Sequence, residues 1–334
     1  MKPYRLLVVF AAVLAFIVVV VGAYVRLSDA GLGCPDWPGC YGKLTPGAAA
    51  PKIAQAVAEQ GGTFGAVSLH KAWKEMGHRY LAGTLGLLIL AIALVAWRRR
   101  HAIGRSPWLP TALVLVVMLQ AALGMWTVTL LLKPAIVTGH LIGGMTTLAM
   151  LTWLALAQWR YYEAPAARSL RGPAAIGLAV LAVQIVLGGW VSTNYAALAC
   201  PDLPLCHGQL VPPMDFHDAF HVIRNLGMSA DGQLLPLQAL VAIHWTHRMF
   251  ALVAATVLGW VAWRALRVPQ LRALGALVAA ALVLQLSLGV ANVLLSLPLP
   301  LAAAHNAGAA LLLVSVIVLN FFAFSGAAPR VRQT

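Results

Sequence analysis

Residues 33–40 read GCPDWPGC, and residues 199–206 repeat the pattern as ACPDLPLC. The four cysteines of these two stretches are the only four in the chain. A motif of the form Cys-Pro-Asp-x-Pro-x-Cys that occurs twice predicts two copies of one structural unit. If that prediction is right, further landmarks must repeat in the same order on either side of the two motifs.

The composition is that of a membrane protein. Hydrophobic residues make up 61% of the 334 residues and charged residues 10%, whereas a soluble domain has about a quarter charged residues. Apolar runs of roughly 20 residues, long enough for a helix to cross the hydrocarbon core, recur along the chain. We expect eight transmembrane helices, the first of them a retained helix rather than a cleaved signal, at about residues 6–25, 79–97, 108–131, 137–158, 173–193, 246–263, 272–295 and 302–323.

The net charge of +14 is a signal of topology. With eight spans and the N-terminus inside, the inner segments hold one acidic residue, Glu163, and the outer side is nearly neutral. This positive-inside pattern predicts cytoplasmic termini and explains the basic balance without nucleic acid. The inner bases are Lys2, Arg5, Arg98, Arg99, Arg100, Arg105, Arg160, Arg168, Arg171, Arg264, Arg267, Arg272, Arg330 and Arg332.

Both cysteine pairs lie in long loops that this topology places outside, at about 26–78 and 194–245. A bacterial periplasm permits disulfides, and the short spacers favour Cys34 with Cys40 and Cys200 with Cys206. Other pairings stay open, and a zinc site built from all four cysteines is the rival. We expect structural disulfides in a multi-pass protein of the inner membrane.

The second outer loop differs from the first in its histidines. We assign no ligand role to His207, His217 or His221, which we expect to be solvated or hydrogen-bonded. Residues 214–226 of this loop are expected to form an amphipathic helix on the membrane surface.

Other landmarks repeat with the cysteine motifs and in the same order. A glycine lies twelve residues before each first cysteine, a His-Arg pair begins or nearly begins the next span, and a glutamine is followed twenty residues later by a histidine. The sequence therefore predicts an all-α protein of two tandem four-helix bundles in a pseudo-twofold parallel repeat, residues 1–160 and 173–325. The matched residues are Gly22 with Gly188, His78-Arg79 with His247-Arg248, Gln120 with Gln285, and His140 with His305.

The four repeated histidines are candidate heme ligands. His78 and His140 fall at similar depth near the outer mouths of two spans that run in the same direction, and His247 and His305 repeat this arrangement. Polar side chains inside spans are costly and usually functional, and two imidazoles at one level across a four-helix core can hold a heme iron. Zinc usually needs more ligands than each pair offers. Small residues that leave room for a macrocycle, or that serve helix packing, are Gly77, Gly139, Gly143, Gly144 and Ala304.

The two halves differ three residues before the first histidine of each pair. The first half has Glu75 and the second has His244. Because residues three apart share a helix face, Glu75 should point toward the pocket of His78, where a carboxylate can move a proton. A helix-capping role is the alternative. Arg79 and Arg248 suit heme propionates or lipid headgroups equally well.

These motifs together resemble the heme A synthase family. The resemblance rests on GAYVRLSDAGLGCPDWPGCYGKLTP, EMGHRYLAG, the GH of the fourth span, the second CPD loop, THR and AAAHNAGA, and it covers nearly the whole chain. It implies an oxidoreductase that converts a methyl group of heme O into the formyl group of heme A, with water as the oxygen source.

The resemblance also implies a role for each candidate residue. His247 and His305 would bind a resident heme b, His78 and His140 would face the substrate heme, and Glu75 would be catalytic. It implies the disulfides Cys34–Cys40, the one closer to function, and Cys200–Cys206. A heme O synthase would supply substrate and a quinone or redox protein would accept electrons, while a homo-oligomer is left open. The rivals are a non-catalytic dihaem electron carrier, a heme transporter and a permease.

Overall fold

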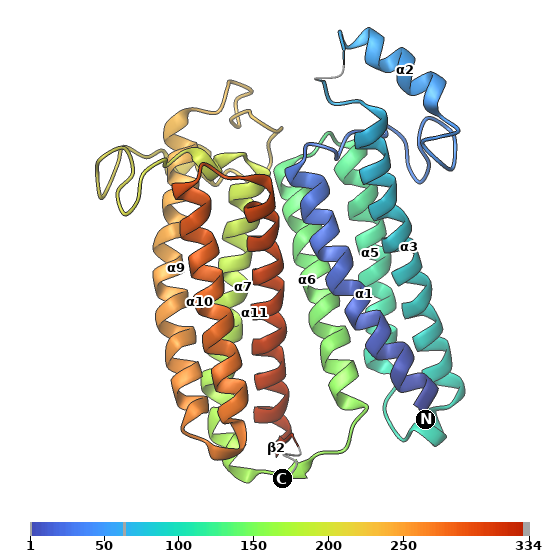
Figure 1. Cartoon of the computed structure of the whole chain (residues 1–334), viewed down its shortest axis with the longest axis vertical. Coiled ribbons are helices and arrows are strands. Elements are labelled where there is room, and N and C mark those ends of the chain that lie inside the picture. Colours follow the sequence, from blue (N-terminus) through green and yellow to red (C-terminus); the bar gives the residue numbers. More distant parts are fainter. Residues whose placement is uncertain (1, 63–64, 330–334) are drawn as a thin grey trace.

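The chain forms an all-α membrane protein. The computed structural model describes residues 2–62 and 65–329. In this part of the chain, eight helices are long and apolar enough to cross a membrane, and they run alongside one another (Figure 1), which confirms the predicted fold class. They are α1 (Lys2–Leu27), α3 (Leu69–Arg98), α5 (Trp108–Thr129), α6 (Pro134–Ala157), α7 (Arg171–Thr193), α9 (Leu237–Leu266), α10 (Arg272–Leu294) and α11 (Leu299–Ser325).

Two helices begin about ten residues earlier than their apolar runs. Helix α3 begins at Leu69 because the Ser68 hydroxyl caps it by accepting a hydrogen bond from the Lys71 N–H at 3.2 Å. Helix α9 begins at Leu237, directly after Pro236. The first turns of both helices are too polar to register as membrane spans, although they continue the same helix. His78 and His247 therefore lie well inside their helices.

The helices pack as two groups of four. Helices α1, α3, α5 and α6 form one group, with α3 and α6 diagonally opposite, and α7, α9, α10 and α11 form the other, with α9 and α11 opposite. The groups meet where α1 and α6 contact α11 and where α6 contacts α7. Treating residues 1–160 and 173–325 as separate domains stays a prediction.

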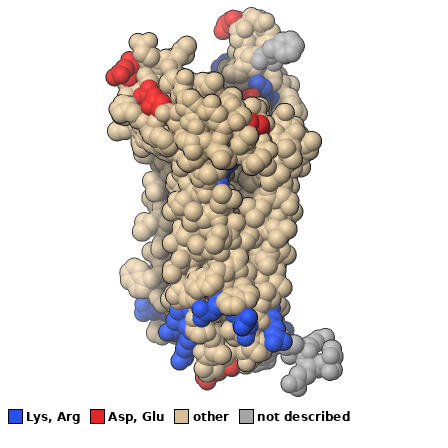
Figure 2. Space-filling model, turned by 90° about the vertical axis from the view of Figure 1, so that its left-hand side faces the viewer, with Lys and Arg blue, Asp and Glu red and all other residues tan. Residues whose placement is uncertain are grey.

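Basic side chains gather at the end of the bundle where α1 begins, below its apolar midsection (Figure 2). The short elements at this end are α4 (Arg100–Ile103), η1 (Pro165–Leu170), η3 (Pro269–Leu271) and the antiparallel pair β1 (Tyr162–Glu163) and β2 (Ala327–Ala328). Arg330 and Arg332, which belong to the predicted inner charges, lie outside the described residues.

The opposite end carries the two long loops. They contain α2 (Ala50–Glu59), which the apolar pattern does not reveal, η2 (Ala196–Leu198) and α8 (Phe216–Ala219). The amphipathic helix expected over 214–226 is wrong, because only α8 is helical there. Arg224 is buried instead, and it donates hydrogen bonds to the side chain of Asn194 at 2.5 Å and to the carbonyl of Met228 at 3.0 Å. These contacts hold the segment in an irregular path.

We expect Gly275→Ala to destabilise the hairpin of α9 and α10. A Cβ atom at Gly275 would lie 2.7 Å from the backbone nitrogen of Leu266 and 2.9 Å from the carbonyl oxygen of Ala262, so the helices would have to separate. Overpacking of this kind costs about 1–3 kcal/mol. Thermal unfolding in detergent measures the loss, and Gly259→Ala in α9, where a Cβ meets open space, is the matched control. Equal stability of the two variants would contradict the packing.

Candidate functional site

Each cysteine motif folds into a small disulfide-bonded loop. Cys34 is bonded to Cys40 and Cys200 to Cys206, which confirms the local pairing and rules out the zinc site made from all four thiols. In residues 2–62 and 65–329, no cluster of three or more His, Cys, Asp or Glu side chains could hold a free metal ion. The cysteines are therefore structural links in both loops.

The aspartate of the motif organises the turn that follows the second cysteine. Asp36 accepts hydrogen bonds from the backbone N–H groups of Tyr41, at 2.5 Å, and Gly42, at 2.7 Å. Both of these residues have positive φ angles, a backbone conformation that favours glycine. In the second loop Asp202 accepts from His207 and Gly208 in the same way, and these N–H groups, led by that of Gly208, hold its pKa below the usual value.

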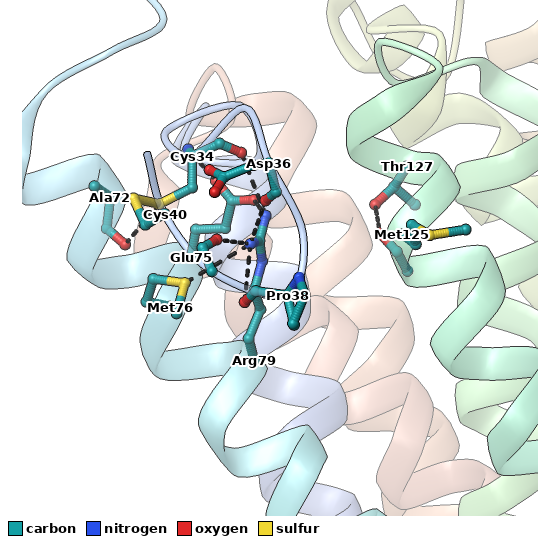
Figure 3. A network of polar contacts seen from close by, with 12 residues as sticks. Cys34, Asp36, Pro38, Cys40, Ala72, Glu75, Met76, Arg79, Met125 and Thr127 are labelled. Carbon is teal, nitrogen blue, oxygen red and sulfur yellow. Dashed lines mark hydrogen bonds and ion pairs between the residues drawn. A yellow bond between two sulfur atoms is a disulfide. The ribbon is translucent and has the colours of Figure 1, made fainter. Parts of the chain in front are cut away.

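The Glu75 side chain ties the first loop to α3. It is 4% exposed, and its Oε2 accepts a hydrogen bond from the Cys34 N–H at 2.9 Å. Its Oε1 forms an ion pair with Nη2 of Arg79 at 2.5 Å (Figure 3). Glu75 is the seventh residue of α3, whose cap is Ser68, so the capping alternative for Glu75 is wrong.

The Arg79 guanidinium continues this network into the disulfide loop (Figure 3). Its Nη1 donates to the carbonyl oxygens of Asp36 at 2.7 Å and Gly39 at 2.6 Å, and its Nη2 reaches the carbonyl of Cys34 at 3.3 Å. One cation thus satisfies several loop carbonyls and the Glu75 carboxylate at once.

The second half builds the same network with a histidine in place of the carboxylate. Nδ1 of His244 lies 3.3 Å from the Cys200 backbone nitrogen and its Nε2 lies 3.2 Å from Nε of Arg248, and a neutral imidazole accepts a hydrogen bond from one of these two donors at a time. Arg248 also donates to the carbonyls of Asp202 at 2.8 Å and Cys200 at 2.6 Å. The comparison of the two halves of the sequence showed only that Glu75 and His244 differ. In the structure both side chains link the disulfide loop to the arginine of their half, and only Glu75 is a carboxylate.

These contacts define what the two arginines do in this structure. Their guanidinium groups point into the loops and hold the backbone, rather than extending to the lipid surface. The contact of Arg79 and Arg248 with heme propionates stays a prediction. Among the loop histidines, His207 is hydrogen-bonded, with its Nε2 2.8 Å from the carbonyl oxygen of Ala199, and His217 is exposed beside Asp218.

Each of the four repeated histidines lies against a glycine of a neighbouring helix. A Cβ atom at Gly22 would lie 2.7 Å from Cε1 of His78, and one at Gly188 would lie 3.0 Å from Cε1 of His247. The corresponding distances are 3.3 Å for Gly124 with His140 and 3.1 Å for Gly289 with His305. The glycine before each cysteine motif, seen in sequence only as a landmark, therefore makes room for an imidazole.

The paired histidines lie on diagonal helices of each group of four. His78 and His140 both lie near the outer-loop ends of their helices, α3 and α6, and His247 and His305 lie likewise on α9 and α11. All four residues keep partial exposure although they lie within the bundle. Nδ1 of His78 and Nδ1 of His305 are buried without a hydrogen-bond partner among the described residues. Imidazole pairs that each lie against a glycine of a neighbouring helix, a glycine cradle, are suited to hold a heme iron.

Glutamines contact three of these histidines. The Gln184 amide nitrogen lies 3.2 Å from Nδ1 of His247, and that of Gln285 lies 3.3 Å from Nε2 of His305. When the oxygen and nitrogen of the Gln120 amide are exchanged, the nitrogen donates to Nδ1 of His140 at 2.8 Å and the oxygen accepts from the Gly144 N–H at 3.1 Å. The sequence pointed to Gln120 and Gln285 as landmarks and missed Gln184, although all three precede a cradle glycine by four residues.

We expect Arg79→Ala to expose the first disulfide to reductant. Removing the guanidinium leaves Glu75 buried without its ion-pair partner, a change that costs about 3–5 kcal/mol in buried pairs. Reduction of Cys34–Cys40 by dithiothreitol should become at least about tenfold faster, as followed by alkylation and mass spectrometry. Arg248→Ala is the matched control and should expose only Cys200–Cys206. An unchanged rate in Arg79→Ala would contradict the tether.

Residues 5–317 match the COX15-CtaA family, described as cytochrome oxidase assembly proteins. A protein of Shewanella oneidensis named heme A synthase is 42% identical over 315 residues, which cover 93% of each chain. A heme A synthase of Caulobacter vibrioides is 31% identical, again over 93% of each chain. One from Halalkalibacterium halodurans is 28% identical over 70% of this chain and 73% of its own.

Proposed function

The chain belongs to the COX15-CtaA family of cytochrome oxidase assembly proteins, and from this premise we propose that it is a heme A synthase. In this proposal it oxidises a methyl group of heme O to the formyl group of heme A, for use by terminal oxidases. The observation that carries the proposal is the pair of matched histidine sites, of which only the first has a buried carboxylate, Glu75, three residues from a histidine. The relative named heme A synthase, which is 42% identical over 93% of each chain, supports the proposal.

We assign the second pair, His247 and His305, to a resident heme b. The glycine cradles beside both rings leave room for these residues, which would hold the heme iron. A heme b bound there supplies a one-electron redox centre. His78 and His140 are assigned to the substrate heme, because they lie in the half that contains Glu75.

The conversion of a methyl group to a formyl group removes four electrons and four protons and adds one oxygen atom from water. Two successive hydroxylations give a geminal diol, which loses water to form the aldehyde. Each hydroxylation releases two protons and two electrons. The protein must therefore provide a proton acceptor close to the reacting carbon and a route for electrons to an acceptor.

Glu75 is the residue of this chain suited to the proton transfer. Each of its oxygens has one hydrogen-bond donor, the Cys34 N–H on Oε2 and the Arg79 guanidinium on Oε1, which leaves a lone pair free on each. A carboxylate can take a proton from attacking water at such a lone pair, and its charge stabilises a cationic carbon. His244, its neutral counterpart, offers no negative charge for this step.

The same proposal covers location and partners. The basic end of the bundle would face the cytoplasm of a bacterial inner membrane, with both termini, and the cysteine loops would face the periplasm. A prenyl-transferring heme O synthase would supply the substrate, and a quinone or a redox protein would take the electrons. A homo-oligomer stays a prediction.

We expect Glu75→Ala and Glu75→His to abolish formyl formation while the b-type absorbance survives. Glu75→His is the sharper variant, because it copies the second half and can keep one of the two accepted hydrogen bonds while removing the negative charge. Purified protein is incubated with heme O and an electron acceptor, and the extracted porphyrins are separated by chromatography.

The contrasting variants are His247→Ala and His305→Ala, which should lose the resident heme. Turnover that persists in Glu75→His would contradict the role of the carboxylate. Wild-type protein that binds two hemes and yields no formyl product would favour the electron carrier instead, and protein with no heme spectrum would favour a permease.

A further inference from the structure

Three of the four histidines have a glutamine amide within hydrogen-bond distance, and His78 does not. Gln184 lies four residues before the cradle glycine Gly188, and the matched position before Gly22 is Val18. Residues four apart share a helix face, so Val18 and Gln184 hold equivalent positions on the faces whose glycines, Gly22 and Gly188, meet His78 and His247. Valine can make no hydrogen bond. Nδ1 of His78 accordingly has no partner in the described part of the chain, whereas Nδ1 of His247 has an amide at 3.2 Å.

Gln184 has the chemistry that an iron-bound imidazole requires. An iron held by Nε2 leaves a hydrogen on Nδ1, which needs an acceptor when the ring is buried. The Oε1 atom of Gln184 is buried and without a partner among the described residues, while its amide nitrogen faces Nδ1 and the His247 carbonyl, at 3.2 and 3.3 Å. A half-turn of the amide would bring Oε1 to Nδ1, where it accepts that hydrogen, and would break the amide hydrogen bond to the His247 carbonyl.

We propose that Gln184 is a positioning residue that makes the His247 site retain its heme, and that Val18 leaves His78 a weaker and exchangeable ligand. An acceptor on Nδ1 fixes the plane of the ring and makes Nε2 a stronger donor to the metal. Without one, the His78 ring is positioned by packing, which includes its contact with Gly22, and not by a hydrogen bond on Nδ1. This inference rests on the proposed function, in which the first heme must leave after turnover and the second must stay.

Two substitutions at Gln184 test the inference, because they should shift the midpoint potential of the heme in opposite directions. They are made in His78→Ala protein, so that only the second pair of histidines closes on an iron. Gln184→Val copies the first half, and heme should transfer to apomyoglobin about 10–100-fold faster, with a more positive midpoint potential. Gln184→Glu keeps a stronger acceptor, so the potential should become more negative while heme loss does not speed up.

The reciprocal test is at Val18 in the otherwise unchanged chain. Val18→Gln should slow heme exchange at the first site about tenfold or more, and Val18→Leu, which adds volume without a hydrogen bond, should leave it unchanged. A purely structural role for Gln184 would lower heme content without moving the potential in opposite directions.

Different results would contradict the positioning role of Gln184 and the proposed function. If Gln184→Val and Gln184→Glu leave potential and heme loss unchanged, or shift the potential in the same direction, the positioning role is wrong while the proposed function stands. If wild-type protein binds no low-spin heme and makes no heme A, the proposed function itself is wrong.

Discussion

A histidine imidazole inside an apolar helix bundle must obtain its hydrogen-bond partners from the protein, and this constraint shapes both halves of the molecule. Lipid offers no hydrogen bonds, so each buried polar atom that stays unpaired raises the cost of the fold. Four imidazoles are accommodated here by glycines on neighbouring helices, and three of them have a glutamine amide within hydrogen-bond distance. The imidazoles that lie against these glycines mark the places where a metal ligand is expected.

The outer loops obey the same constraint by different means. A single guanidinium in each half takes up several backbone carbonyls of a disulfide loop and fastens it to a helix. The partner of that guanidinium is Glu75 in one half and His244 in the other. The two halves share this scaffold, and the exchange of Glu75 for His244 makes them chemically unequal at this position. The disulfide loop and the candidate proton acceptor are therefore mechanically linked.

Most of the fold could be predicted from the sequence because membrane spans and repeats leave strong local signals. Eight apolar runs and the matched landmarks sufficed for the number of membrane-spanning helices, and cysteine spacing favoured the two disulfides that the structure contains without excluding other pairings. Helix starts at Leu69 and Leu237 were missed because hydropathy detects the membrane, not the helix. The path of residues 214–226 was missed because the buried contacts of Arg224 join segments far apart in the chain.

The candidate site was predictable only in part. Histidines and Glu75 stood out because ionisable residues are rare in spans, whereas the shared role of Glu75 and His244 depends on loop backbone that no motif encodes. Gln184 lacked a repeat partner, so it was not a landmark, and only its contact with His247 revealed it.

The most direct test of the central claim is the number of low-spin ferric hemes that one polypeptide binds, measured by electron paramagnetic resonance during a titration of purified protein with heme. The account predicts two bis-histidine sites, one lost in His78→Ala/His140→Ala and the other in His247→Ala/His305→Ala. A protein that binds no low-spin heme, or whose sites survive both double substitutions, would contradict it.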